Sequence, residues 1–311
     1  MILIGTSEGV YRAPTNEIDD ATLALDSERV LRVRRFDDAV YAATSSGLFR
    51  SVDGGETWND LGVPRREVFA VLESPDGERL YAGTHPAHLY VSADGGESWR
   101  ERESLLELPS YDTWRTPRHR DEGRVHSLDA HLDAPERVVA GIEVGGVLRS
   151  DDNGHTWTEY RDGVHNDVHH VLVVGPAEYI ASTGGGLYRT RDAGRSWMRL
   201  DGDLDRSYFV EAFAHNGRLY IAGAAPPPAW DGERGPDAVL YESTDGGDSF
   251  EIVALPDEIE DRPLVFAWAA PSGESDEVFA ATYDGHVLKR HAGEWRTVGD
   301  LETTIHSIAL S

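Results

Sequence analysis

One eight-residue phrase recurs along the chain and restricts the folds that are open to it. The phrase is Ser/Thr-x-Asp-x-Gly-x-Ser/Thr-Trp/Phe, and it occupies residues 51–58, 92–99, 150–157, 190–197 and 243–250, with a degenerate copy at 289–295. Its aspartates are Asp53, Asp94, Asp152, Asp192 and Asp245, separated by 41, 58, 40 and 53 residues. Self-similarity at such a period is the signature of a repeat architecture.

The residues of the phrase are those of a self-bonded turn. An Asp carboxylate accepts hydrogen bonds from backbone N–H groups of its own turn, and Gly adopts backbone conformations that other residues resist. We expect the terminal aromatic ring to fold back onto the sheet. Because the aspartates recur so regularly along the chain, they are predicted to be structural and not to form one active site.

Short apolar segments precede each phrase and define seven similar units. Segments of the type Gly-Leu-Tyr-Arg lie at 9–12, 47–50, 146–149, 186–189, 239–242 and 286–289, and segments of the type Tyr-Ala-Gly-Thr lie at 3–6, 41–44, 81–84, 138–141, 180–183, 220–223 and 279–282. Four short strands per unit of about 40 residues make one propeller blade. The sequence therefore predicts an all-β, seven-bladed β-propeller formed by residues 1–311 as one domain.

The two ends of the chain predict how the propeller closes. The first unit starts at its second strand, whereas residues 304–310 look like a first strand with no blade after it. We expect this C-terminal strand to pair into the N-terminal blade. Such closure leaves few sheet edges exposed to aggregation.

These motifs resemble the Asp-box (BNR) propellers, and more closely the prokaryotic proteins named sialidase-like or BNR-like glycosyl hydrolases. The resemblance covers nearly the whole chain and extends to sortilin-type and photosystem II assembly-factor propellers. It implies the fold but not one function, because these relatives include enzymes, receptors and assembly factors. A sialidase site implies three arginines from separate blades, and no such set can be assigned here.

The charge of the chain limits its partners and its setting. There are 56 acidic residues against 29 basic ones, a net charge of −27, and Lys289 is the single lysine. Such a surface repels phosphate backbones and anionic membranes, so neither nucleic acid nor a membrane is an expected partner. Acid excess with lysine depletion favours a salt-loving cell, the alternative being an acidic mesophilic protein.

No targeting or redox signal is found. The chain has no cysteine, so neither disulfides nor thiolate chemistry is available. The first residues have no basic region and read as a strand, not a signal peptide, and no apolar run approaches the length of a membrane span. We expect a cytoplasmic protein without a cofactor.

Two insertions mark the face on which a ligand is expected. In a propeller the turns between strands 4 and 1 and between strands 2 and 3 share one face, opposite the 3→4 turns that carry the aspartates. Residues 101–123 form a 4→1 connection and residues 224–237 a 2→3 connection, so both are predicted on the face opposite the aspartate turns. Long loops on a rigid scaffold are where binding sites usually lie.

Each insertion can be interpreted as a ligand-binding element or as a purely structural one. Trp114 provides a stacking face, and Arg115, Arg118 and Arg120, with His119 beside them, provide donors for an anion or a glycan; alternatively, ion pairs pin this loop to acidic neighbours. In the second insertion, Trp230 follows a proline run and forms a lid or wall, or a spacer packed on the surface.

Histidines form a further candidate group. His126, His169 and His306 hold matching positions near the start of three first strands, and His85, His88 and His165 lie in loops of the same face. Three such imidazoles could hold a metal or donate protons. However, Phe69 and Phe266 hold the matching positions in other blades, which favours packing by any flat ring.

Function is left between two classes. The leading hypothesis is a non-catalytic binding or assembly scaffold that meets a protein or a small anionic ligand at the insertion face. The alternative is a carbohydrate-active enzyme, a glycoside hydrolase or lyase, with its site on the same face. A glycosidase needs two carboxylates at a fixed separation, and sequence alone cannot select them among 56 acids.

Overall fold

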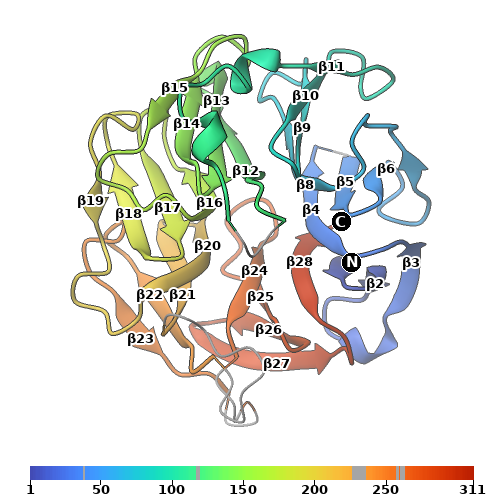
Figure 1. The fold of residues 1–311 in the computed structure, drawn as a ribbon. Coiled ribbons are helices and arrows are strands. Elements are labelled where there is room, and N and C mark those ends of the chain that lie inside the picture. The colour runs from blue at the N-terminus through green and yellow to red at the C-terminus, as the bar shows by residue number, and fades with distance from the viewer. Residues whose placement is uncertain (38, 117–119, 226–235, 257–258, 260–262) are drawn as a thin grey trace. The chain divides into compact units, whose positions relative to one another are not determined.

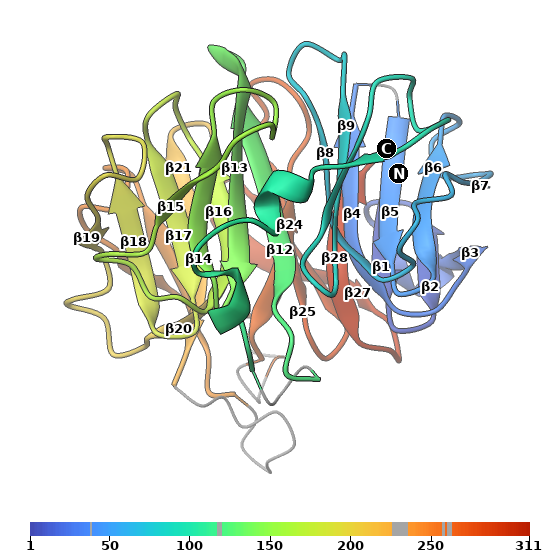
Figure 2. The same cartoon turned by 45° about the horizontal axis from the view of Figure 1, so that its top comes forward.

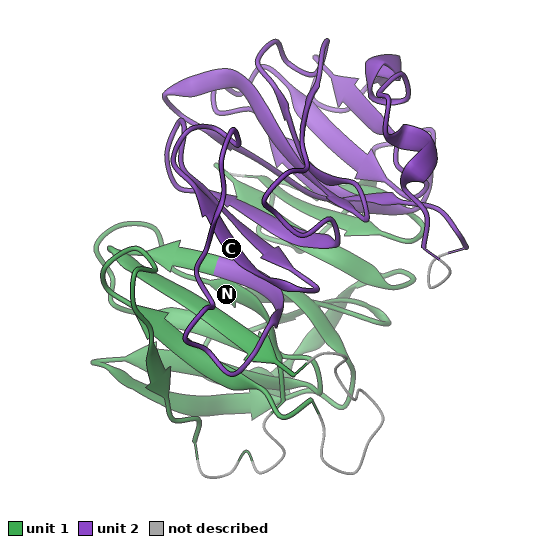
Figure 3. Cartoon of the chain, turned by 60° about the vertical axis from the view of Figure 1, so that its left-hand side comes forward, with its two compact units in different colours: residues 1–60, 213–311 green, residues 61–212 purple. Residues whose placement is uncertain are grey.

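The computed structural model describes residues 1–37, 39–116, 120–225, 236–256, 259 and 263–311. The chain forms two compact units, one of residues 1–60 with 213–311 and the other of residues 61–212 (Figure 3). We call them unit 1 and unit 2 and treat each by itself.

The strands form seven antiparallel sheets of four strands each (Figures 1 and 2). We number these sheets as blades 1 to 7, with strand orders β28-β1-β2-β3, β4-β5-β6-β7, β8-β9-β10-β11, β12-β13-β14-β15, β16-β17-β18-β19, β20-β21-β22-β23 and β24-β25-β26-β27. The predicted all-β, seven-bladed propeller fold is thereby confirmed.

Unit 1 holds blades 1, 2 and 7 and most of blade 6. Its strands are β1 (Ile2–Thr6), β2 (Gly9–Ala13), β3 (Thr22–Asp26), β4 (Val30–Phe36), β5 (Ala39–Thr44), β6 (Gly47–Ser51), β7 (Asn59–Asp60), β21 (Arg218–Ala224), β22 (Val239–Ser243), β23 (Glu251–Val253), β24 (Val265–Ala269), β25 (Val278–Thr282), β26 (His286–His291), β27 (Glu294–Asp300) and β28 (Ile305–Leu310). The short 3₁₀ helix η1 (Ile18–Asp20) interrupts the connection from β2 to β3.

Unit 2 holds blades 3, 4 and 5. Its strands are β8 (Val68–Glu73), β9 (Leu80–Thr84), β10 (Leu89–Ser92), β11 (Arg100–Glu101), β12 (Arg124–His131), β13 (Ala134–Glu143), β14 (Gly146–Ser150), β15 (Thr158–Tyr160), β16 (Val168–Val173), β17 (Tyr179–Thr183), β18 (Gly186–Thr190) and β19 (Met198–Arg199). Two 3₁₀ helices, η2 (Glu103–Leu105) and η3 (Tyr111–Thr113), lie in the first insertion, and β20 (Tyr208–His215) runs from this unit into unit 1. Within the described ranges no helix has the length and apolar character to cross a bilayer.

The last strand completes the first blade, as the chain ends predicted. β28 pairs antiparallel with β1, with Ile4 opposite Ile308 and Ile2 opposite Leu310. The N–H of Ser311 donates to the carbonyl of Met1 at 3.1 Å. The five residues of β1 and the six of β28 therefore hold both ends of the chain in one sheet.

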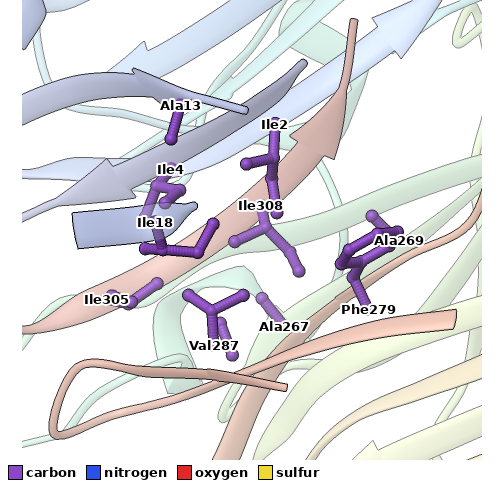
Figure 4. Close-up of a cluster of buried hydrophobic side chains, with 11 residues drawn as sticks. Ile2, Ile4, Ala13, Ile18, Ala267, Ala269, Phe279, Val287, Ile305 and Ile308 are labelled. Carbon is purple, nitrogen blue, oxygen red and sulfur yellow. The ribbon is translucent and has the colours of Figure 1, made fainter. Parts of the chain in front are cut away.

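Within each unit the core lies between successive blades, so both faces of the inner strands are buried. Alternate residues of a strand point to opposite faces. Ile2 and Ile4 pack with Phe279 of blade 7 (Figure 4), whereas Leu3 packs with Val33 and Val40 of blade 2. This double burial explains why these strands read as continuous apolar runs rather than as alternating ones.

The recurring phrase forms the expected self-bonded turn between strands 3 and 4. In the first copy, Asp53 Oδ1 accepts from the N–H of Thr57 at 2.9 Å, and Oδ2 accepts from the Thr57 hydroxyl at 2.6 Å. Gly55 has φ +86°, and a Cβ there would lie 2.6 Å from Leu3 Cδ2 in the preceding blade. The same carboxylate bonds recur at Asp94, Asp152, Asp192 and Asp245.

Candidate functional site

The first strand of a blade carries a one-residue β-bulge near its start. In unit 2 the pairing registers of β8, β12 and β16 skip Phe69, His126 and His169. In unit 1 the skipped residues are Leu31, Phe266 and His306. A bulge re-aims the side chain that it carries, so the matching positions of the histidines in the sequence are these bulge positions.

The bulged side chains of unit 2 form a row of rings. The ring centroids of Phe69 and His126 lie 5.9 Å apart, those of His126 and His169 5.8 Å, and those of His169 and Tyr208 4.9 Å. The His126 and His169 rings meet edge to face at 84°, a favourable packing of flat rings. These contacts agree with the packing interpretation of the histidine positions.

Two further positions lie beside each bulge, and we name them by their place in the blade. The lead position is two residues before the bulge. The exit position is the residue that follows the second-strand partner of the residue just before the bulge, as His85 follows Thr84, the partner of Val68. Within blades 3 and 5 the exit residue donates its N–H to the carbonyl of the lead residue at 2.9 Å, as His85 does to Glu67 and Gly184 to Asp167. In blade 4 the two are register partners, Arg124 and Glu143.

In unit 2 the lead and exit positions carry acidic, basic or imidazole side chains, except at the glycine Gly184. Together with the bulged histidines they form what we call the His–carboxylate cluster: Glu67, His85, Arg120, Arg124, His126, Glu143, Asp167 and His169. Each member except Arg120, which belongs to the first insertion, follows from the blade register.

Glu143 is a buried carboxylate held by a guanidinium. Its side chain is 7% exposed and forms an ion pair with Arg124, which is 14% exposed. The guanidinium also lies 4.4 Å above the Phe69 ring, within range of a cation–π contact. The Arg124 guanidinium is therefore the charge partner of the Glu143 carboxylate in a poorly hydrated place.

Asp167 lies directly opposite Glu143 across the gap between blades 4 and 5. The two residues form an antiparallel β-bridge, and directly opposed residues have Cβ atoms about 4.5–5.5 Å apart on the same face. Asp167 Oδ1 lies 3.6 Å from His169 Nε2, while His169 Nδ1 contacts the carbonyl oxygen of Phe209 at 2.7 Å. Because a carbonyl only accepts hydrogen bonds, Nδ1 carries a proton and Nε2 faces the carboxylate.

A second carboxylate–imidazole group lies at blade 3. The Arg120 guanidinium contacts both Glu67 and His85, and His85 Nε2 lies 3.9 Å from a Glu122 oxygen. Burial lowers the pKa of His85, although Glu67 acts in the opposite direction. Burial alone would raise the pKa of Glu67, but the hydrogen bond from Arg120 and the neighbouring His85 hold that pKa below its usual value.

The first insertion, with Pro86 and Ala87, lines a partly open pocket of about 150 Å³. Tyr111 is one of its lining residues, and its hydroxyl donates to the Ala87 carbonyl at 3.3 Å. Trp114 is only 3% exposed, donates from Nε1 to Ser110 Oγ, and contacts Tyr111 with ring centroids 5.0 Å apart. The Trp114 ring, which the sequence suggested as a stacking face for a ligand, therefore packs within the insertion.

Arg115 and Arg120 of the insertion contact neighbouring acids. Arg115 Nε donates to the Asp112 carbonyl at 2.9 Å, and its Nη1 lies 3.9 Å from Asp121, while Arg120 bonds to Glu67. These contacts match the alternative reading of the loop, in which ion pairs pin it to acidic neighbours. Arg118 and His119, and Trp230 of the second insertion, lie outside the described residues.

The remaining histidines have local partners. His165 Nδ1 accepts from the N–H of Asp167 at 3.2 Å, and His88 is paired with Glu101. In unit 1, His306 Nε2 accepts from Arg29 Nε at 3.2 Å. Burial, assisted by the Arg29 charge, lowers the pKa of His306 to about 3, so this imidazole is neutral at physiological pH.

A metal site is not formed by the residues that the structure describes. Among them, no group of three or more His, Asp or Glu side chains has an arrangement that could hold a metal ion. His126 and His169 are neighbours in unit 2, whereas His306 belongs to unit 1. The histidine trio remains a sequence-based hypothesis.

Sequence reasoning did not select Glu67, Arg124, Glu143 or Asp167. The sequence carried a signal for Glu67, Arg124 and Asp167, because aligning the blades on the bulged residue puts a charged residue at the lead position of blades 3, 4 and 5. Glu143 is harder to find, since its exit position is recognised only from the pairing register of the first and second strands of blade 4. The β-bridge from Glu143 to Asp167 links two blades and has no sequence signature.

Comparison with known proteins finds a distant sequence relative and solved structures of similar fold. No family model matches the chain. A xyloglucanase of Hypocrea jecorina (strain QM6a) is 24% identical over 197 residues, which are 60% of this chain and 22% of that enzyme. The chain thus spans about a fifth of the length of this relative.

Solved structures agree on the fold. The GH74 xyloglucanase of Xanthomonas campestris superposes with a TM-score of 0.69 at 16% identity, covering 99% of this chain and 52% of that one. The GH74 enzyme of Niastella koreensis gives 0.66 at 15% identity, covering 86% and 45%. A YCF48 propeller bound to a D1 peptide gives 0.60 at 17% identity, covering 86% and 81%. The chain is similar to all three in fold, and it spans about half the length of the two enzymes.

Proposed function

We propose that this chain is a carbohydrate-active protein of the glycoside hydrolase type that takes a neutral polysaccharide at the His–carboxylate cluster. The observation that carries the proposal is the alignment with a xyloglucanase over 197 residues, supported by the fold similarity to GH74 enzymes. It replaces the scaffold hypothesis as the leading one, because the likeness to the xyloglucanase extends to the sequence alignment, whereas the likeness to the peptide-bound YCF48 propeller is one of fold.

The chemistry of the cluster agrees with a glycan ligand. Carboxylates and imidazoles at the starts of three successive first strands offer hydrogen-bond acceptors and proton carriers to sugar hydroxyls. In the cluster the carboxylates of Glu67, Glu143 and Asp167 outnumber the guanidiniums of Arg120 and Arg124, and the whole chain carries −27. A neutral glucan is therefore expected to bind better than an anionic polysaccharide, which this charge repels.

Binding and cleavage can be measured together. The chain, at high salt, is incubated with xyloglucan, cello-oligosaccharides and polygalacturonate, and binding is followed by calorimetry while new reducing ends are counted. Binding of a neutral glucan with release of reducing ends is the expected result. If neither neutral glucan binds at millimolar concentration, the proposed function is wrong.

A peptide-binding role is the second candidate, because the chain covers 81% of a peptide-bound YCF48 propeller but only about half of the GH74 enzymes. On this alternative, a peptide would bind and no glucan would. A peptide array probed with the labelled chain, run beside the glycan panel, separates the two.

A further inference from the structure

We propose that Arg120 is an autoinhibitory side chain, which occupies the Glu67 and His85 acceptors of the His–carboxylate cluster and is displaced when a neutral glucan binds. The inference rests on the proposed function and adds to it a regulation of the same site. The other members of the cluster are placed by the register of blades 3, 4 and 5. Arg120 alone is added to the cluster by the first insertion.

One nitrogen of Arg120 lies against two acceptor atoms. Arg120 Nη2 contacts Glu67 Oε2 and lies 2.5 Å from His85 Nδ1, and these two acceptor atoms are 3.2 Å apart. Because a guanidinium only donates hydrogen bonds, its contact with Nδ1 uses the lone pair of that nitrogen. Two lone pairs at such a distance repel each other unless a donor stands between them, and Arg120 supplies that donor.

A sugar hydroxyl can take the place of the Arg120 nitrogen. An O–H group donates one hydrogen bond and accepts others, so a glucan hydroxyl between Glu67 and His85 would satisfy the same acceptors. Arg120 and the glucan therefore compete for one place. The apparent affinity for the glucan is lowered in proportion to the fraction of molecules in which that place is open.

The Arg120 side chain is far more exposed than the acceptors that it contacts. The exposed fractions are 61% for Arg120, 29% for Glu67 and 3% for His85. An ion pair with a largely exposed partner contributes little, because water and salt screen it. A ligand can therefore displace Arg120 at low cost, while the two acceptors stay in place within blade 3.

The backbone beside Arg120 is fixed, so displacement needs only a rotation of the side chain. Arg120 and Asp121 have φ +55° and +59°, values that residues other than glycine seldom adopt. The N–H of Asp121 donates to the Thr116 carbonyl at 3.0 Å, and the N–H of Ala87 donates to the Gly123 carbonyl at 2.9 Å. These bonds aim the Arg120 side chain at the cluster and leave its outer atoms in solvent.

The charges around His85 agree with an imidazole that accepts from Arg120. Burial lowers the pKa of His85, the charges of Arg120 and Arg124 act in the same direction, and Glu67 opposes them. On its other side, His85 Nε2 lies 3.9 Å from a Glu122 oxygen. Loss of the Arg120 charge should raise the pKa of His85, which reports on the contact without any glycan.

The test compares Arg120→Ala with Arg115→Ala in the full chain. Arg115 belongs to the same insertion, is 59% exposed, and contacts Asp112 and Asp121 instead of the cluster. At the lowest KCl concentration that keeps the chain folded, calorimetry with xyloglucan and cello-oligosaccharides should show about five-fold tighter binding by Arg120→Ala. Arg115→Ala should bind like the parent. Raising KCl to 2 M should narrow the difference, because salt screens the contact between Arg120 and Glu67.

Nitrogen NMR of the histidine rings gives a second, glycan-free measurement. The pKa of His85 should be higher in Arg120→Ala than in the parent and in Arg115→Ala. Equal or weaker glucan binding by Arg120→Ala, an equal gain in Arg115→Ala, or an unchanged pKa of His85 overturns the inhibition and leaves the proposed function intact. If none of the three chains binds a neutral glucan, the proposed function fails and the inhibition fails with it.

Discussion

At the scale of single residues, the side chains at the bulges of β8, β12 and β16 pack as flat rings, and charged side chains lie at the lead positions beside them. Phe69, His126 and His169 are equivalent by register and share ring contacts, so an imidazole here serves partly as a flat ring. His306 shows the same in unit 1, where it is 8% exposed and contacts the Phe266 ring. A neutral buried imidazole makes stability depend on pH.

His306→Phe is expected to flatten the acid side of the stability profile. The folded pKa of His306, about 3, is lower than the ordinary 6.5, so its contribution is complete above about pH 6.5 and is lost as pH falls toward 3. The variant loses the bond from Arg29 and is less stable at pH 7, but the difference from the parent should shrink as pH falls. Urea unfolding from pH 7 to pH 4 measures this, with exposed His291→Phe as control. A constant difference across that range would contradict it.

Asp192→Ala is expected to lower the melting temperature by removing the bonds within its turn. Hydrogen bonds from the Ser196 hydroxyl and N–H and from Thr190 lower the pKa of Asp192 to about 2. A depressed carboxyl pKa contributes stability above its unfolded value of about 4, which is lost as pH falls through about 2. Thermal unfolding followed by circular dichroism at pH 7 should show a clear loss for Asp192→Ala and none for Asp203→Ala, an exposed acid outside the turns.

At the scale of elements, polar side chains link one blade to the next at repeated places. Arg12 donates to the carbonyl of Gly54, and Arg149 to that of Ala193, each the fourth residue of the next aspartate turn. Ser127 bonds to the N–H of Val171 at 3.1 Å. Blade 7 has the degenerate phrase, and there the link is reversed: Glu242 of blade 6 accepts from Arg290 and Trp295.

Arg149→Ala is expected to cost about 2 kcal/mol of unfolding free energy, because it leaves the Ala193 carbonyl without its donor in a buried place. Arg149 is 7% exposed, pairs with Asp151 at 2.9 Å and lies 5.0 Å from the Tyr160 ring centre. Arg149→Lys should restore only part of the loss, since an ammonium lacks the planar fork. Guanidinium unfolding measures both, with the exposed Arg191→Ala as control; equal losses at the two positions would rule out a special role for the link.

At the scale of the whole molecule, net charge is the dominant long-range effect. With 56 acids and 29 bases the folded chain repels itself, and salt shortens the range of this repulsion from about 8 Å at 0.15 M to about 3 Å at 1 M. The salt-loving setting suggested by lysine depletion stays a prediction.

We expect the melting temperature to rise steeply between 0.1 and 2 M KCl. Because the charge is a property of the chain and not of one site, the rise should persist in Glu143→Gln and Asp167→Asn. Scanning calorimetry over this range measures it, with sucrose of equal osmolality as the uncharged control. A flat response, or an equal response to sucrose, would show that charge repulsion does not limit stability.

The sequence by itself determined the fold class, the number of blades and the closing strand, because these follow from local chemistry that repeats: the Asp–Gly turn, the apolar strand and its period. It also located the bulged positions of His126, His169 and His306. Only the tertiary structure decided which charged residues meet. Trp114 turned into its own loop, Arg120 reached Glu67, and Glu143 came opposite Asp167 because contacts between blades depend on how separate sheets pack, which no local pattern encodes.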